Sequence, residues 1–202
     1  TAGMLAFVDD RIGRMLKKLE DTGQLDNTII IYTSDHGELH GHHGLWGKGL
    51  AAFEDCQRVP LIISAPKHFP AKGTTQALAS LVDLPRTFLG LADTKVPQGM
   101  QGRDLSPLLR GETESVQDAV MVESRPTQHT LYQHTLITAD HKLCVYRDWD
   151  EGELYDLKAD PDQYTNLWTD PASRDLREKL LLRLARQHMQ REGEVHPRIN
   201  FG

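Results

Sequence analysis

The chain has 202 residues, of which 39% are hydrophobic and 26% charged, and its formal net charge at pH 7 is −6. This composition predicts a globular protein that buries its own core, and the negative charge excludes a strongly basic nucleic-acid-binding surface. No apolar run approaches the ~20 residues that a membrane-spanning helix needs, and no signal peptide is visible, so neither nucleic acid nor a membrane is an expected partner.

The chain has two cysteines, Cys56 and Cys144, and each lies in or beside an apolar segment. Two cysteines do not make a disulfide framework, so both are expected to pack as small hydrophobic residues. This usage favours a reducing compartment such as the cytoplasm.

The first part of the chain is typical of a helix followed by a strand. Apolar residues recur at three- and four-residue spacing through residues 4–19, and Gly23 stands where a helix C-cap is expected. Residues 28–33 then form an apolar, β-branched run without alternation, which predicts a strand buried in a parallel sheet. No strand precedes this helix, so we expect the chain to begin partway through a domain.

The middle of the chain adds further predicted elements. A second strand is expected at residues 59–64, bracketed by Pro60 and Pro66. Asp83, two residues before Pro85, marks the start of a helix that runs to about residue 92. A surface loop over residues 97–113 and a strand at residues 119–123 follow.

After Arg125 the pattern changes to short alternating segments at residues 131–138, 142–147 and 153–157. These predict a small antiparallel sheet, and Asp170 with Pro171 opens a closing helix. The predicted fold is therefore α/β: part of a mixed, largely parallel sheet flanked by helices over residues 1–125, then a small antiparallel subdomain with a helix over residues 126–202.

Asp35 and His36 follow the strand predicted at residues 28–33, in a loop where Gly37 permits a tight turn. A carboxylate beside an imidazole suits Ca²⁺, Mg²⁺, Mn²⁺ or Zn²⁺, and ligands in α/β sheets bind just beyond strand ends. Two ligands do not fill the coordination sphere of such an ion, so others must come from elsewhere. The alternative is that Asp35 caps the loop and His36 bonds to the backbone.

The loop has four histidines within eight residues, His36, His40, His42 and His43, which raises the competing idea of a local zinc site. Their spacing matches no HExxH or HxHxDH pattern, and the intervening glycines exclude a helix that would align the rings. Most of these rings are expected to face solvent or to orient other groups. Lys48, between Gly47 and Gly49, can approach an oxyanion, although such a lysine is often only a solvated surface residue.

Four ordered motifs give this chain its resemblance to a known family. Residues 34–48 carry the pattern SDHGxxxGxHGxWxK, residues 58–63 read RVPLII, residues 81–87 read LVDLPRT, and residues 153–167 carry ELYDL, DP and NL in order. Together with the opening helix and strand, they resemble the C-terminal half of type I sulfatases of the alkaline phosphatase superfamily.

The resemblance implies a function for each candidate residue. Asp35 and His36 would be metal ligands, typically for Ca²⁺, and Lys48 would bind a sulfate oxygen of the substrate, while His43 is a weaker candidate near the leaving group. The implied substrate is a small-molecule or carbohydrate sulfate ester. A divalent ion and a lysine can stabilise charge on sulfate oxygens while the S–O bond breaks.

Two departures from the family pattern keep other readings open. The family's C/S-x-P-S-R motif, whose first residue matures to formylglycine, is absent from these residues, and so is its early Asp-Asp metal pair. We therefore expect the nucleophile on the remainder of the same polypeptide, which would be this chain's partner. His36, where many sulfatases have Asn, leaves phosphonate monoester and phosphodiester hydrolases of the superfamily as the enzyme alternative. An inert domain that serves binding or assembly is the non-enzyme alternative.

Overall fold

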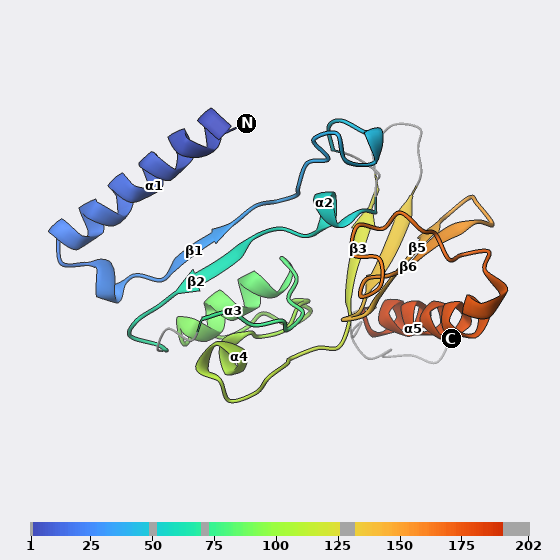
Figure 1. Ribbon diagram of the computed structural model, residues 1–202. Coiled ribbons are helices and arrows are strands. Elements are labelled where there is room, and N and C mark those ends of the chain that lie inside the picture. Colours follow the sequence, from blue (N-terminus) through green and yellow to red (C-terminus); the bar gives the residue numbers. More distant parts are fainter. Residues whose placement is uncertain (1, 49–51, 70–72, 126–131, 192–202) are drawn as a thin grey trace, which may run out of the picture. The chain divides into compact units, whose positions relative to one another are not determined.

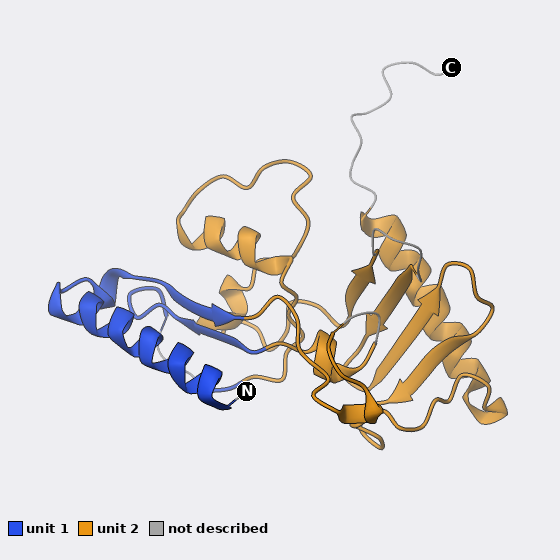
Figure 2. Ribbon diagram, turned by 90° about the horizontal axis from the view of Figure 1, so that it is seen from above, with its two compact units in different colours: residues 1–33, 60–74 blue, residues 34–59, 75–202 orange. Residues whose placement is uncertain are grey.

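The computed structural model describes residues 2–48, 52–69, 73–125 and 132–191 (Figure 1). They form an α/β structure in two units, residues 1–33 with 60–74 and residues 34–59 with 75–202 (Figure 2). No helix within the described ranges combines the length and apolar character needed to cross a membrane.

The first unit contains α1 (Ala2–Asp21), the 3₁₀ turn η1 (Leu25–Asn27), β1 (Ile30–Thr33) and β2 (Leu61–Ser64). Gly23, at φ 65°, follows the end of α1, as a C-cap glycine does. None of the residues of α1 is buried; in its apolar stripe Met4 is 76% and Met15 68% exposed, while Ile12, Leu16 and Leu19 are half-buried. The stripe that the sequence predicts thus exists, but this unit covers it only in part.

β1 corrects one prediction, because it pairs antiparallel with β2, with Ile31 opposite Ile63. A buried parallel strand was expected from the apolar run at residues 28–33. Instead Ile30 and Ile31 are half-buried, while Tyr32 and Thr33 are exposed. The run identifies the strand, but strand direction depends on a partner about 30 residues away, which local composition does not encode.

The second unit contains an antiparallel sheet in the order β3-β4-β5-β6; the sequence predicts this sheet from its last three strands, and β3 joins it as a fourth. Its strands are β3 (Val120–Ser124), β4 (Gln133–Ile137), β5 (His141–Tyr146) and β6 (Gly152–Asp156), and the closing helix is α5 (Arg174–Arg191). The predicted start of β4 at Leu131 lies outside the described residues. The predicted domain boundary after residue 125 stays a prediction, although β3, which ends before it, already belongs to this sheet.

One row of side chains crosses this sheet and forms the core against α5. The register pairs Met121 with Leu136, Leu136 with Leu143, and Leu143 with Leu154, so the four lie on one face. Leu180 and Leu184 of α5 pack on that face, where the helix lies in Figure 1. Alternating apolar residues in short strands and a helical stripe thus meet as the sequence predicts.

The unit also contains α2 (Glu54–Gln57), α3 (Asp83–Leu91), α4 (Ser106–Arg110) and the 3₁₀ turns η2 (His42–Gly44) and η3 (Pro171–Ser173). α3 begins at Asp83, as predicted. α4 interrupts the segment expected to be a loop, because five residues are too few for a helical periodicity to stand out. The side chains of Cys56 and Cys144 are both buried, as predicted, and burial raises the pKa of Cys144 to about 11.

The contact between β4 and α5 makes the stability of this unit sensitive to pH. His134 Nδ1 lies 2.8 Å from His188 Nε2. Burial lowers the pKa of His134 below its ordinary 6.5; Glu123 opposes the shift, and His188, Arg125 and Arg191 add to it. Because the unfolded chain then binds more protons, the free energy of unfolding falls as pH drops through 6.5 towards the lower folded pKa.

We therefore expect a His134→Gln variant to lose part of this slope. Urea unfolding of wild type and variant at several values between about pH 7.5 and 5 measures it, since histidine titrates in this range. Parallel curves for the two proteins would show that His134 does not carry the effect.

Candidate active site

The loop that follows β1 is closed by its own backbone and fastened to α2. Leu39 N donates to Gly47 O at 3.0 Å, and Gly37 N donates to Cys56 O at 2.9 Å. A Cβ at Gly37 would lie 1.7 Å from Asp55 O, so only glycine allows this approach. Gly37 therefore determines how closely the loop approaches α2.

Three of the four predicted site residues meet at the base of this loop. Lys48 Nζ lies 2.8 Å from His36 Nε2, and that same nitrogen lies 3.5 Å from Asp35 Oδ2. His36 Nδ1 lies 2.9 Å from Gly37 O. A carbonyl only accepts, so His36 donates through Nδ1 and its Nε2 lone pair faces the ammonium of Lys48.

The electrostatics of this group favour binding a cation. The backbone N–H of His36 donates to Asp35 Oδ1 at 3.0 Å, and this bond is the largest cause that lowers the pKa of the Asp35 carboxyl. The carboxylate is thus ionised at neutral pH, beside a neutral imidazole with a lone pair. These two donors fit a divalent ion, and Lys48 is the cation that His36 contacts in this structure.

His43, the fourth predicted residue, makes its ring contacts elsewhere. It stacks on Phe53 with 3.7 Å between ring centroids and 7° between planes, and it lies 4.7 Å from Tyr164 and 4.3 Å from His42. The backbone of His43 has a φ of 53°, which lies in the left-handed region. Its proposed position near a leaving group stays a prediction.

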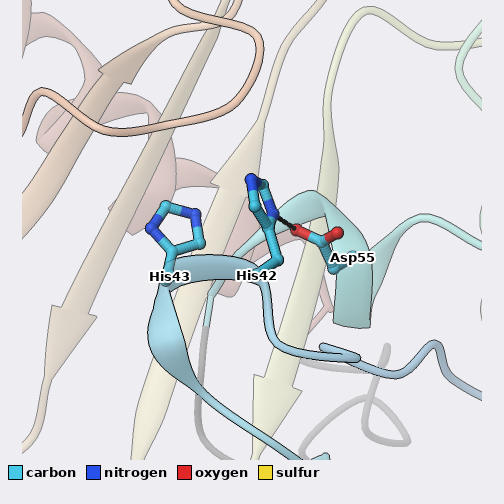
Figure 3. A group of neighbouring side chains, drawn as sticks. All are labelled: His42, His43 and Asp55. Atoms are coloured by element: carbon cyan, nitrogen blue, oxygen red, sulfur yellow. Dashed lines mark hydrogen bonds and ion pairs between the residues drawn. The ribbon is translucent and has the colours of Figure 1, made fainter.

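The sequence reasoning missed Asp55, which meets the loop from α2. Its Oδ2 lies 2.6 Å from His42 Nδ1 (Figure 3). Thirteen residues separate the two in sequence, so no local spacing relates them, and an acidic residue in a short helix usually faces solvent. The only available signal was an acidic pair, Glu54 and Asp55, shortly after a histidine-rich loop.

The second unit also has a cleft of about 980 Å³, lined in part by five arginines, and none of the four predicted residues lines it. The arginines come from α3, the loop before α4, and α5: Arg86, Arg103, Arg183, Arg186 and Arg191. Arg183 is paired with Asp118 and Arg191 with Glu123. The predicted site residues therefore belong to the loop after β1 and not to this cleft.

Comparison with known proteins agrees with the resemblance seen in the motifs. The family described as N-sulphoglucosamine sulphohydrolase, C-terminal, matches residues 41–190. Among curated proteins, an N-acetylglucosamine-6-O-sulfatase of Bacteroides thetaiotaomicron is 43% identical over 168 aligned residues, and the match covers 80% of this chain and 30% of that protein.

Solved structures give the same picture. BT4656 in complex with its substrate, D-glucosamine-2-N,6-O-disulfate, has a TM-score of 0.87 at 36% identity, covering 93% of this chain and 39% of that one. The phosphonate monoester hydrolase of Agrobacterium radiobacter has a TM-score of 0.82 at 30% identity, covering 92% and 40%. The chain thus spans well under half the length of these relatives. It belongs to the N-sulphoglucosamine sulphohydrolase family of sulfatases in the alkaline phosphatase superfamily and corresponds to their C-terminal portion.

Proposed function

We propose that the protein to which this chain belongs hydrolyses sulfate esters. The observation that carries the proposal is the convergence of Asp35, His36 and Lys48 on one point of the loop. An ionised carboxylate, a neutral imidazole and an ammonium there form a group suited to a divalent ion and to the negatively charged oxygens of a sulfate ester. The family to which the chain belongs supports the same reaction.

Each residue has a defined part in this proposal. Asp35 and His36 hold a divalent metal, with Ca²⁺ as the first candidate and Mn²⁺, Mg²⁺ or Zn²⁺ as alternatives. When bound, the ion supplies positive charge that stabilises the oxygens of the sulfate group. The ammonium of Lys48, then no longer held by His36, binds a sulfate oxygen, and His43 stays the weaker candidate near the leaving group.

The remainder of the polypeptide supplies the formylglycine nucleophile and the other metal ligands. The exposed part of the apolar stripe of α1 supports this division, since Met4, Leu5 and Met15 need a partner surface to be buried. A carbohydrate sulfate is the favoured substrate class, because two of the three relatives compared above act on or bind sulfated glucosamines.

The alternative reaction is hydrolysis of phosphonate monoesters or phosphodiesters. Two phosphonate monoester hydrolases share this fold at 29% and 30% identity, which favours keeping this alternative. Sulfate and phosphonate esters both present charged oxygens to a metal and a lysine, so the loop alone does not separate them.

The test compares turnover of an aryl sulfate and an aryl phosphonate by the full-length protein. We expect kcat/KM to favour the sulfate, and the 202-residue chain alone to show background activity and little binding of Ca²⁺ in calorimetry, because it lacks the nucleophile and half of the metal ligands. A preference for the phosphonate would support the alternative reaction. A full-length protein that carries no C/S-x-P-S-R motif and hydrolyses neither ester would be the inert domain.

A further inference from the structure

A second group of potential metal ligands lies at the tip of the same loop. His42 and His43 of η2 and Asp55 of α2 each offer one donor atom, and these three atoms all lie within 4.8 Å of one another. Figure 3 shows the two rings side by side, with the Asp55 carboxylate beyond His42. Three donors from two segments of chain thus converge without belonging to the Asp35 and His36 pair.

One ring nitrogen of His43, its Nε2, is buried and has no hydrogen-bond partner among the described residues. In Figure 3 the His43 ring turns a nitrogen towards His42. A buried polar atom without a partner costs free energy, and the backbone of this residue is also held at φ 53°. A ligand that met this nitrogen would offset both costs.

We propose that His42, His43 and Asp55 form a binding site for a transition-metal ion of the zinc class. Two imidazoles and one carboxylate are the donors that Zn²⁺ takes in many proteins, with water completing a tetrahedron. The 2.6 Å contact between His42 Nδ1 and Asp55 Oδ2 is shorter than the ~3.3 Å between neighbouring ligands of a tetrahedral zinc ion. A bound ion would take the place of the proton that His42 Nδ1 and Asp55 Oδ2 share. These two atoms would then move apart by roughly 0.7 Å.

The other clusters of the chain fit such an ion less well. Glu123, His134 and His188 also lie close together. However, Arg125 lies 2.8 Å and Arg191 3.8 Å from the oxygens of Glu123, so its charge is already compensated by two cations. Asp35 and His36 offer two donors beside the ammonium of Lys48. The choice of His42, His43 and Asp55 thus follows from donor number and local charge.

The consequence of binding is a cross-link between the loop and α2. The loop already bonds to itself through Leu39 and Gly47, next to Lys48, and to α2 through Gly37 and Cys56. An ion bound by η2 and Asp55 would add a second cross-link to α2, at the tip of the loop. This cross-link would oppose opening of the loop. The inference concerns metal binding and loop stability and does not depend on which ester the enzyme hydrolyses.

The experiment is calorimetric titration of the full-length protein with Zn²⁺, after chelator treatment and in excess Ca²⁺, which prefers oxygen ligands. We expect one equivalent of Zn²⁺ to bind and to raise the melting temperature. His42→Gln, His43→Asn and Asp55→Asn should each weaken binding more than about 100-fold, since losing even an outer-shell partner of a metal site costs 10–100-fold. Asn suits the φ of His43.

Three control variants locate the site. His40→Asn keeps the loop but lies outside the cluster, His188→Gln removes a member of the other histidine cluster, and Asp35→Asn removes the proposed sulfatase ligand. All three should bind Zn²⁺ as wild type does, even where Asp35→Asn abolishes hydrolysis. Absence of zinc binding to the folded wild-type protein, or equal binding by His42→Gln and Asp55→Asn, would overturn the proposal. Circular dichroism confirms folding of each variant.

Discussion

Replacing Lys48 by Ala in the full-length enzyme is expected to lower kcat on sulfate esters by about 10²- to 10³-fold, the usual cost of losing one preorganised contact to a developing oxyanion. The structure supports this expectation, because Lys48 Nζ lies 2.8 Å from His36 Nε2, at the same point as the Asp35 carboxylate. Steady-state kinetics on an aryl sulfate measures the effect. Folding should hardly change, since Lys48 lies exposed in a glycine-rich loop.

Leu180→Ala is the matched control for this variant. Leu180 is 6% exposed and belongs to the core between α5 and the sheet, so its truncation should cost about 2–5 kcal/mol of unfolding free energy. The folded fraction of this variant should keep wild-type kcat. Wild-type kcat/KM in Lys48→Ala on every sulfate ester that the enzyme hydrolyses would reduce Lys48 to a surface lysine.

The parts of the fold that the sequence predicts are those set by local periodicity. Strands β4 to β6 and α5 follow from alternating segments and a helical stripe, whereas β3 was predicted as a strand but not as part of this sheet. The row from Met121 to Leu154 places apolar residues of the sheet on one face. The predicted parallel pairing of β1 was wrong, because the direction of pairing depends on β2, a distant partner. A strand's own residues define which side chains alternate, but not the neighbour with which it pairs.

The candidate site shows the same division between local and distant information. Asp35, His36 and Lys48 meet because a glycine-rich loop closes on itself, which motif spacing captures. The contact between His42 and Asp55 was not predicted, because it joins the loop to α2 across 13 residues. The left-handed conformation of His43 was not predicted either, since non-glycine residues rarely adopt it.

Lys142 is the residue whose environment departs most from its sequence pattern. In a strand a lysine is expected in solvent, yet this side chain is 0% exposed. Its ammonium lies 2.5 Å from Glu54 Oε1 and donates to Ala52 O at 2.8 Å. Burial lowers the pKa of Lys142, and the charge of Glu54 opposes that shift. The second face of the sheet is therefore covered by the segment that leads into α2.

Two further hydrogen bonds hold α2 in place on this part of the unit. Glu54 N donates to Gln163 Oε1 at 2.6 Å, and Gln57 Nε2 donates to Thr135 Oγ1 at 3.2 Å. α2 in turn holds the loop through the hydrogen bond from Gly37 N to Cys56 O. The position of the candidate site thus depends on an ion pair that joins β5 to α2, in which Lys142 is fully buried and lies far from Lys48 in sequence.

Lys142→Met should consequently lower the free energy of unfolding by about 3–5 kcal/mol, the usual effect of removing one partner of a buried pair. The methionine fills the space of the lysine stem, so the loss reports mainly the uncompensated Glu54 carboxylate and Ala52 carbonyl. Glu54→Gln should cost a similar amount, because its amide oxygen still accepts from the ammonium but leaves the fully buried charge of Lys142 without a counter-charge. In the double variant Lys142→Met with Glu54→Leu, most of the stability should return, since two apolar residues leave no charge unpaired. Urea unfolding of Lys142→Met, Glu54→Leu, the double variant and the wild type gives the coupling energy. Additive losses in the double variant would show that the pair does not hold this face together.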